Sequence, residues 1–202
     1  MKLAELPEAN TRAVRLACEV MRRYASPAMA NHAARSACWA RAIGHAEHLD
    51  FDVELLQVAA LLHDLGLEEP FDSHRCSFEQ SGGEVSWVFA AGADWPEPRR
   101  DRLVEVIVRH MWTAVNVDHD VEGHLLERAT AFDIAAAGWD LIDPALRAEV
   151  LAAWPPLDIT ERFLSCFNDQ AERKPNSAAA RSMASGLPAR MASHPMLRPS
   201  LG

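Results

Sequence analysis

The chain has 202 residues, which is enough to bury a substantial core within one domain of ordinary size. Hydrophobic residues make up 49% of the chain, which argues against disorder throughout, and the single Tyr and nine Gly favour helix over sheet. The formal net charge of −9 argues against nucleic acid as the main partner, because binding to a phosphate backbone depends on clustered Lys and Arg.

Apolar residues recur at helical spacing along nearly the whole chain, and no segment alternates with the period of a strand. The first helix has Asn10 or Thr11 as a plausible N-cap, the second has Pro27 near its first turn, and the third has Asp52 as a candidate cap. Segment 67–76 is predicted to be an irregular loop. We therefore expect an all-α fold, a single compact bundle, with helices at 10–25, 27–49, 52–66, 77–92, 97–112, 121–141, 144–154 and 158–172.

Two glycines, Gly82 and Gly83, lie inside the predicted helix 77–92. Glycine destabilises a helix interior, so a compensating gain is required. We expect close packing of another backbone against this helix.

The composition changes after Glu172. Residues 173–202 contain five basic residues and no acidic one, which gives this segment +5 and leaves −14 for residues 1–172. We predict a helical domain over 1–172 followed by a basic Ser/Ala/Pro-rich extension over 173–202 that is weakly ordered. The alternative is an arm that lies back across the acidic body or onto a neighbouring subunit.

Several ionisable residues lie inside otherwise apolar helices. They are His32 in "MANHAARSACWA", His63 and Asp64 in "AALLHDLG", His110 in "VEVIVRHMW" and Asp133 in "RATAFDIAAAG". A buried ionisable group is costly without a partner, and convergence on one divalent cation would satisfy several groups at once. Neighbouring residues on a helix point about 100° apart. His63 and Asp64 could therefore share an ion only in a groove between helices.

Two imidazoles and two carboxylates form a mixed nitrogen and oxygen donor set. This set suits Zn, Mn, Fe, Co or Ni better than an all-oxygen Ca site or a thiolate Zn site. Such a cation would lower the pKa of a bound water and make hydroxide available near neutrality.

The order His…His-Asp…Asp, from His32 to Asp133, resembles the HD-domain superfamily of metal-dependent hydrolases. In addition, "HAARSACWA" and "SFEQSGG" resemble motifs of its cyanamide-hydratase-like subgroup, which adds water to small carbon–nitrogen compounds or hydrolyses them. The resemblance implies an HD-type bundle with a motif core over 28–140. It also implies a divalent metal, zinc before Fe, Mn, Co or Ni, with four ligands: His32, His63, Asp64 and Asp133.

Three further residues are candidates for catalysis. Arg35 follows His32 by one turn and could orient Asp64 or hold an anionic substrate, or it could form a salt bridge between helices. Glu79 could position an imidazole or move a proton, or it could be an exposed first-turn glutamate. His110 is expected to face the substrate as an acid, a base or a hydrogen-bond donor.

The leading functional expectation is a hydrolase or hydratase that uses a metal-bound hydroxide on a nitrile-like or amide-like carbon. One alternative is a metal-dependent phosphohydrolase acting on a nucleotide or another phosphate ester; another is a non-catalytic HD regulatory module. We expect a small-molecule substrate, no nucleic-acid or membrane partner, and a homo-oligomer as an open alternative to a monomer. A cytoplasmic location is expected because the four cysteines are scattered and the N-terminus does not resemble a signal peptide. The remaining histidines are expected at the surface: His45, His48, His74, His119, His124 and His194.

Overall fold

The structure, a computed structural model, describes residues 1–197. Within this range it contains helices and no strand, so the predicted all-α class is confirmed. None of the helices in this range combines the length and the apolar character needed to cross a bilayer. The α-helices are α1 (Arg12–Tyr24), α2 (Pro27–Ala46), α3 (Val53–Leu62), α4 (Phe78–Gly92), α5 (Glu97–Arg109), α6 (Val121–Ala135), α7 (Pro144–Ala153), α8 (Ile159–Arg173), α9 (Ala178–Ala184) and α10 (Leu187–Ser193).

The helices begin at side chains that cap them. The hydroxyls of Thr11 and Ser26 accept from the backbone N–H groups of the third residues after them, which starts α1 and α2. Asp52 accepts from the backbone N–H of Leu55 at 2.9 Å, so its predicted role as the cap of α3 is confirmed.

Several helices end earlier than predicted, α2 at Ala46 rather than residue 49 and α6 at Ala135 rather than residue 141, and two of them end at a histidine. α3 ends at Leu62 rather than Gly66, and α5 ends at Arg109 rather than at residue 112. His63 and His110 are therefore C-cap residues, and each donates from Nδ1 to the carbonyl three residues before it. These side chains replace part of the normal helical hydrogen bonding, and both rings are held at the ends of rigid helices.

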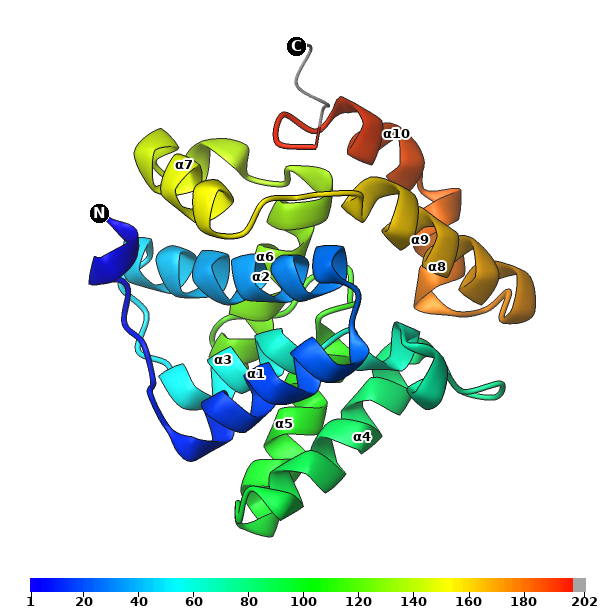
Figure 1. The fold of residues 1–202 in the computed structure, drawn as a ribbon, viewed down its shortest axis with the longest axis horizontal. Coiled ribbons are helices and arrows are strands. Elements are labelled where there is room, and N and C mark those ends of the chain that lie inside the picture. Colours follow the sequence, from blue (N-terminus) through cyan, green and yellow to red (C-terminus); the bar gives the residue numbers. More distant parts are fainter. Residues whose placement is uncertain (198–202) are drawn as a thin grey trace.

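Figure 1 shows α2 crossing the middle of the molecule, with α4 and α5 side by side at one end. The turn η2 (Leu65–Leu67), just after the His63–Asp64 doublet, packs against α4. A Cβ on Gly66 would lie 2.0 Å from the carbonyl oxygen of Phe78, and one on Gly82 would lie 3.1 Å from the backbone nitrogen of Gly66. The expected close backbone packing against α4 is confirmed, and it fixes the turn that presents the doublet.

Buried apolar residues form two clusters. The larger includes residues of α1–α3 and α5–α7, and the smaller joins the start of α2 to α8, α9 and α10. On α6, Phe132 belongs to the larger cluster and Ile134 to the smaller, with the buried carboxylate of Asp133 between them. The ionisable residues are therefore found where the two apolar clusters meet.

The C-terminal extension folds back onto the body, so the expectation of weak order is wrong for residues 178–197. α9 and α10 bury Ala179, Leu187 and Met191 against α8 and α6. His194, expected at the surface, is also buried. Its Nε2–H donates to the carbonyl of Phe132 at 3.0 Å, and its Nδ1 accepts from a backbone N–H at 3.0 Å. The 172/173 domain boundary stays a prediction, and Arg198 lies outside the described residues.

Candidate metal centre

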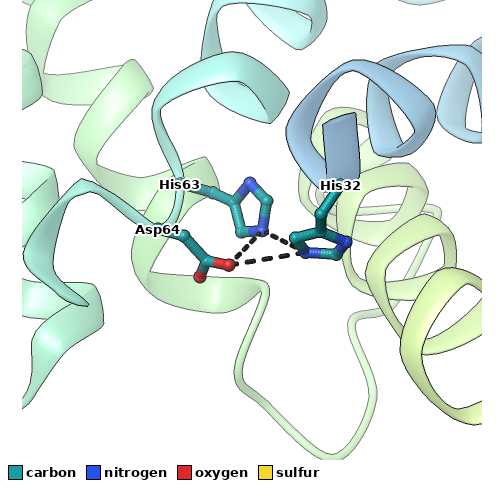
Figure 2. A group of neighbouring side chains, drawn as sticks. All are labelled: His32, His63 and Asp64. Carbon is teal, nitrogen blue, oxygen red and sulfur yellow. Dashed lines mark hydrogen bonds and ion pairs between the residues drawn. The ribbon is translucent and has the colours of Figure 1, made fainter. Parts of the chain in front are cut away.

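Three buried side chains from two helix regions meet at one point. His32 comes from α2, while His63 and Asp64 come from the turn after α3 (Figure 2). The Nε2 atoms of the two imidazoles are 3.2 Å apart, and Asp64 Oδ2 lies 3.4 Å from the first and 3.2 Å from the second. All three donor atoms lie within 4.8 Å of one another, which is the arrangement that shared coordination of an ion requires.

The hydrogen bonding of His63 and the charge of Asp64 suit a divalent cation. His63 donates from Nδ1 to the carbonyl of Ala60 at 2.8 Å, so its Nε2 can present a lone pair to the cluster. Burial opposes the charged form of Asp64, but His63 and His32 outweigh it and hold the pKa of this carboxyl well below its usual range. Asp64 Oδ2 is buried and has no hydrogen-bond donor among residues 1–197. A cation would provide the missing partner.

His32 is held from its other side by Asp133. Asp133 Oδ2 accepts from His32 Nδ1 at 2.7 Å and from Arg35 at 2.7 Å. The second oxygen accepts from Arg35 Nε at 2.8 Å and from the indole N–H of Trp39 at 2.6 Å. The carboxylate thus lies behind His32, outside the three-residue cluster. The structure brings together three of the four predicted ligands and gives the fourth a different position.

The position of Asp133 has a simple cause. His32, Arg35 and Trp39 occupy one face of α2 at helical spacing, and together they present four donors to a single carboxylate on α6. Arg35 is fully buried and also donates to the carbonyls of Trp154 and Pro155 at 3.2 and 3.3 Å. Arg35 therefore forms the salt bridge between helices, and its guanidinium does not face Asp64.

His110 lies beside the cluster, and its role toward a substrate stays a prediction. Its Nε2 lies 3.8 Å from Asp64 Oδ1, and its ring centroid is 4.9 Å from that of His63. Its Nδ1 donates to the carbonyl of Ile107, in the same arrangement as His63. Burial, reinforced by the neighbouring His63, lowers the pKa of His110 to about 3. The ring is neutral at physiological pH, and its Nε2 points a lone pair toward the site.

A cavity of about 220 Å³ opens onto the cluster. Its floor contains His32, His63, Asp64 and His110. The walls are mainly apolar and include Trp112, Ile134, Phe163, Phe167 and Leu187. Three lining residues, Ser182, Leu187 and Arg190, come from the C-terminal arm, residues 178–197. The sequence did not predict this contribution to the cavity. Its one indication was the apolar pair Leu187 and Met191, one helical turn apart.

The remaining predicted residues lie elsewhere. Glu79 is buried, with 7% exposure, but it lines a different cavity and has no hydrogen bond to the cluster. His124 is half-buried rather than exposed, because its Nδ1 donates to the carbonyl of Val115 and its Nε2 lies 3.6 Å from Glu47. His119 is exposed as expected.

Comparison with known proteins agrees with this geometry. The family model of the HD domain matches residues 29–133, slightly more than half of the chain, and this span contains all four residues of the His…His-Asp…Asp pattern. A search of the curated proteins finds no match. HD domains are generally metal-dependent hydrolases. By the extent of this match and by its helical bundle, the chain belongs to the HD-domain family.

Proposed function

We propose that the protein is a metal-dependent hydrolase or hydratase acting on a small, uncharged carbon–nitrogen compound, such as a nitrile or an amide. The supporting observation is the buried cluster of His32, His63 and Asp64 at the floor of a small cavity with mainly apolar walls. These three residues would hold a divalent cation, with zinc as the first candidate. A bound cation would supply Lewis acidity and lower the pKa of a water molecule in the site.

The size of the cavity favours a small substrate. Its volume of about 220 Å³ lies below the range of about 300–1,000 Å³ typical of sites for drug-sized ligands. Phe163, Phe167 and Leu187 would remove water from an uncharged substrate at little cost. Among the described lining residues, Arg190 is the single Lys or Arg, and it already donates to the carbonyl of Ser185 at 2.7 Å. This lining offers little to a phosphate ester.

Each residue around the cluster has a distinct task. Asp133, held by Arg35 and Trp39, fixes the ring of His32 so that Nε2 points into the cluster. Asp64 supplies negative charge. His110 is neutral with its Nδ1–H engaged, so its Nε2 would accept a hydrogen bond and could take a proton from an attacking water.

The test combines metal analysis with a substrate panel. Purified protein would be analysed for bound metal and assayed with cyanamide, small nitriles and small amides, and in parallel with nucleoside monophosphates and a phosphodiester. We expect bound metal and turnover of a cyano or amide compound, both lost in His63→Ala and both kept in His119→Ala, an exposed control. Turnover of phosphate esters alone would replace this proposal with the phosphohydrolase alternative. Protein that neither retains metal nor turns over any compound would favour the regulatory module.

A further inference from the structure

The wall that α6 contributes to the cavity at the metal cluster ends in a polar residue. Five residues of this helix line the cavity, at positions 127, 130, 131, 134 and 135, so one face of α6 follows the cavity for two turns. Ile134 adjoins Asp133, which supports His32. Glu127 lies about 10 Å from Ile134 along the helix axis, because each residue rises by about 1.5 Å. Glu127 is therefore at the end of this wall that is away from Asp133.

The carboxylate of Glu127 has no hydrogen-bond donor and no ion-pair partner among residues 1–197. The two cations nearest to it in the sequence are engaged elsewhere: Arg128 donates to Glu47, and His124 Nε2 lies 3.6 Å from Glu47. Glu127 is half-buried, and its oxygens keep accessible surface. Burial raises its pKa, because partly apolar surroundings disfavour the charged form. A molecule in the cavity can therefore reach this carboxylate and stabilise it by donating a hydrogen bond.

The neighbouring polar groups favour an uncharged donor. Thr130, one turn from Glu127, donates its hydroxyl hydrogen to the backbone carbonyl of Glu127 at 3.0 Å, so its oxygen can offer only lone pairs to the cavity. Arg190, from the C-terminal arm, donates to the carbonyl of Ser185 at 2.7 Å and forms no ion pair with a carboxylate of residues 1–197. Glu127 and Arg190 contribute opposite charges to the lining, so a charged substrate gains little net attraction from them.

We propose that Glu127 determines substrate specificity: it selects small nitriles or amides with an uncharged hydrogen-bond donor, such as a hydroxyl, at the end opposite the reacting carbon. This inference rests on the function proposed for the metal cluster. The donor would form a charge-assisted hydrogen bond with the carboxylate, which is among the stronger kinds. A methyl group in its place would displace water from the carboxylate and leave it unsatisfied. Without the carboxylate the preference should reverse, because a hydroxyl loses more hydration than a methyl group when it enters an apolar cavity.

The experiment compares ω-hydroxy nitriles that have two, three or four methylene groups with the nitriles in which a methyl group replaces the hydroxyl. The corresponding primary amides are assayed in parallel, all with the full-length protein. At one chain length, or at two adjacent lengths, kcat/KM for the hydroxyl compound should be at least tenfold higher than for its methyl counterpart.

Variants assign this preference to the wall of α6. In Glu127→Met the ratio of the two kcat/KM values should fall at least tenfold, to a preference for the methyl compound. Glu127→Gln should keep part of the preference, because its amide oxygen still accepts a hydrogen bond. Thr130→Val should lower the ratio several-fold. Glu161→Gln, a matched change at an exposed carboxylate of α8, should leave the ratio within twofold.

Binding measurements separate this inference from the proposed function. Ligand-observed NMR would give the affinity of each protein for every pair of compounds, whether or not they are turned over. Turnover with the same ratio in wild type and Glu127→Met would overturn the role of Glu127 and leave the proposed function standing. If no nitrile or amide is turned over, the proposed function fails, and the binding ratios decide the role of Glu127. Equal ratios in the two proteins would then refute it, and a hydroxyl preference lost in Glu127→Met would support it.

Two further results bear on the proposal. An ω-ammonium nitrile that is preferred over the hydroxyl compound of the same length would contradict selection of an uncharged donor. Metal content should be the same in wild type and Glu127→Met, since Glu127 lies outside the metal cluster. A far-UV melt of each variant would show that it is folded, and Thr130→Val keeps the proposal testable if Glu127→Met does not fold.

Discussion

Binding of Zn²⁺ to the metal-free protein should release about one proton, and this proton should come from His32. In the absence of a cation, the Nδ1–H of His32 donates to Asp133, while its Nε2 faces His63 Nε2 and Asp64 Oδ2. Burial lowers the pKa of His32, but the hydrogen bond to Asp133 and the nearby carboxylate of Asp64 outweigh burial and raise it to about 9. A protonated ring cannot bind a metal through Nε2, so the cation must displace the proton.

The size of the effect follows from that pKa. At pH 7.5 a group with a pKa of about 9 is about 97% protonated, whereas a histidine with the ordinary value of about 6.5 is about 10% protonated. The predicted release is therefore about 0.97 of a proton, against about 0.1 for an unperturbed ring. At pH 7 the displacement should weaken Zn²⁺ binding about 100-fold relative to alkaline conditions, which corresponds to about 2.7 kcal/mol.

Calorimetric titration in buffers of different ionisation enthalpy would count the released protons at pH 6.5, 7.5 and 8.5. The contribution of His32 should fall to about 0.76 of a proton at pH 8.5, whereas ionisation of a bound water would release more protons as pH rises. Nitrogen-15 NMR of the imidazoles would assign the proton to His32. A release near 0.1 of a proton at pH 7.5, or a neutral His32 in the metal-free protein, would refute the reasoning.

Three further changes have defined outcomes. Arg35→Met should lower the free energy of unfolding by about 3–5 kcal/mol in a denaturant titration, because it leaves the buried Asp133 carboxylate without its guanidinium partner; a loss below about 1 kcal/mol would contradict this. Leu187→Ala should enlarge the cavity at the metal cluster and shift the relative kcat/KM toward substrates one methylene longer. The shift should reach up to about fourfold, because one buried methylene contributes about 0.8 kcal/mol. Unchanged selectivity would mean that the C-terminal arm does not limit substrate size. Burial lowers the pKa of His194, so as pH falls the imidazole is protonated in the unfolded chain before it is protonated in the folded one. The stability that this residue contributes is therefore complete above about pH 6.5 and is lost as pH falls. The difference in unfolding free energy between wild type and His194→Gln should shrink between pH 7.5 and pH 5.

The local features of this fold could be predicted because they depend on short-range chemistry. Apolar spacing located the helices of the body, and Asp52 marked the start of α3. The meeting of His32 with His63 and Asp64 was predictable for a similar reason. Each is an ionisable residue in an apolar helical segment, and such residues require partners wherever the chain folds.

The partner of each buried group was harder to predict, because it depends on how the helices are rotated against one another. Asp133 was predicted to be a ligand, and in the structure its carboxylate accepts hydrogen bonds from Arg35 and Trp39 on the facing helix. Glu79 lies in the first turn of α4, yet that turn faces a different cavity. Spacing along one helix contains no information about that rotation.

The sequence left the C-terminal extension open between weak order and an arm packed against the body, for a different reason. α9 and α10 have seven residues each, which is too short for helical periodicity to stand out from loop sequence. Their order depends on long-range contacts, such as the hydrogen bond from His194 to the carbonyl of Phe132. Isolated helices of this length are not stable in water, so their structure comes from packing.

The buried charges of the metal cluster connect its geometry to the class of substrate. With a divalent cation bound, the rings of His32 and His63 would carry no charge, because each must present a lone pair at Nε2. The remaining charges would be the carboxylates of Asp64 and Asp133, the guanidinium of Arg35 and the cation, which sum to a single excess positive charge in a water-poor site. One monoanion, such as an ionised water, would neutralise that excess, whereas a phosphate monoester carries close to two negative charges near pH 7 and would overshoot it. Because unbalanced charge is costly in such a site, the charge count disfavours a phosphate monoester, and the apolar walls favour an uncharged substrate.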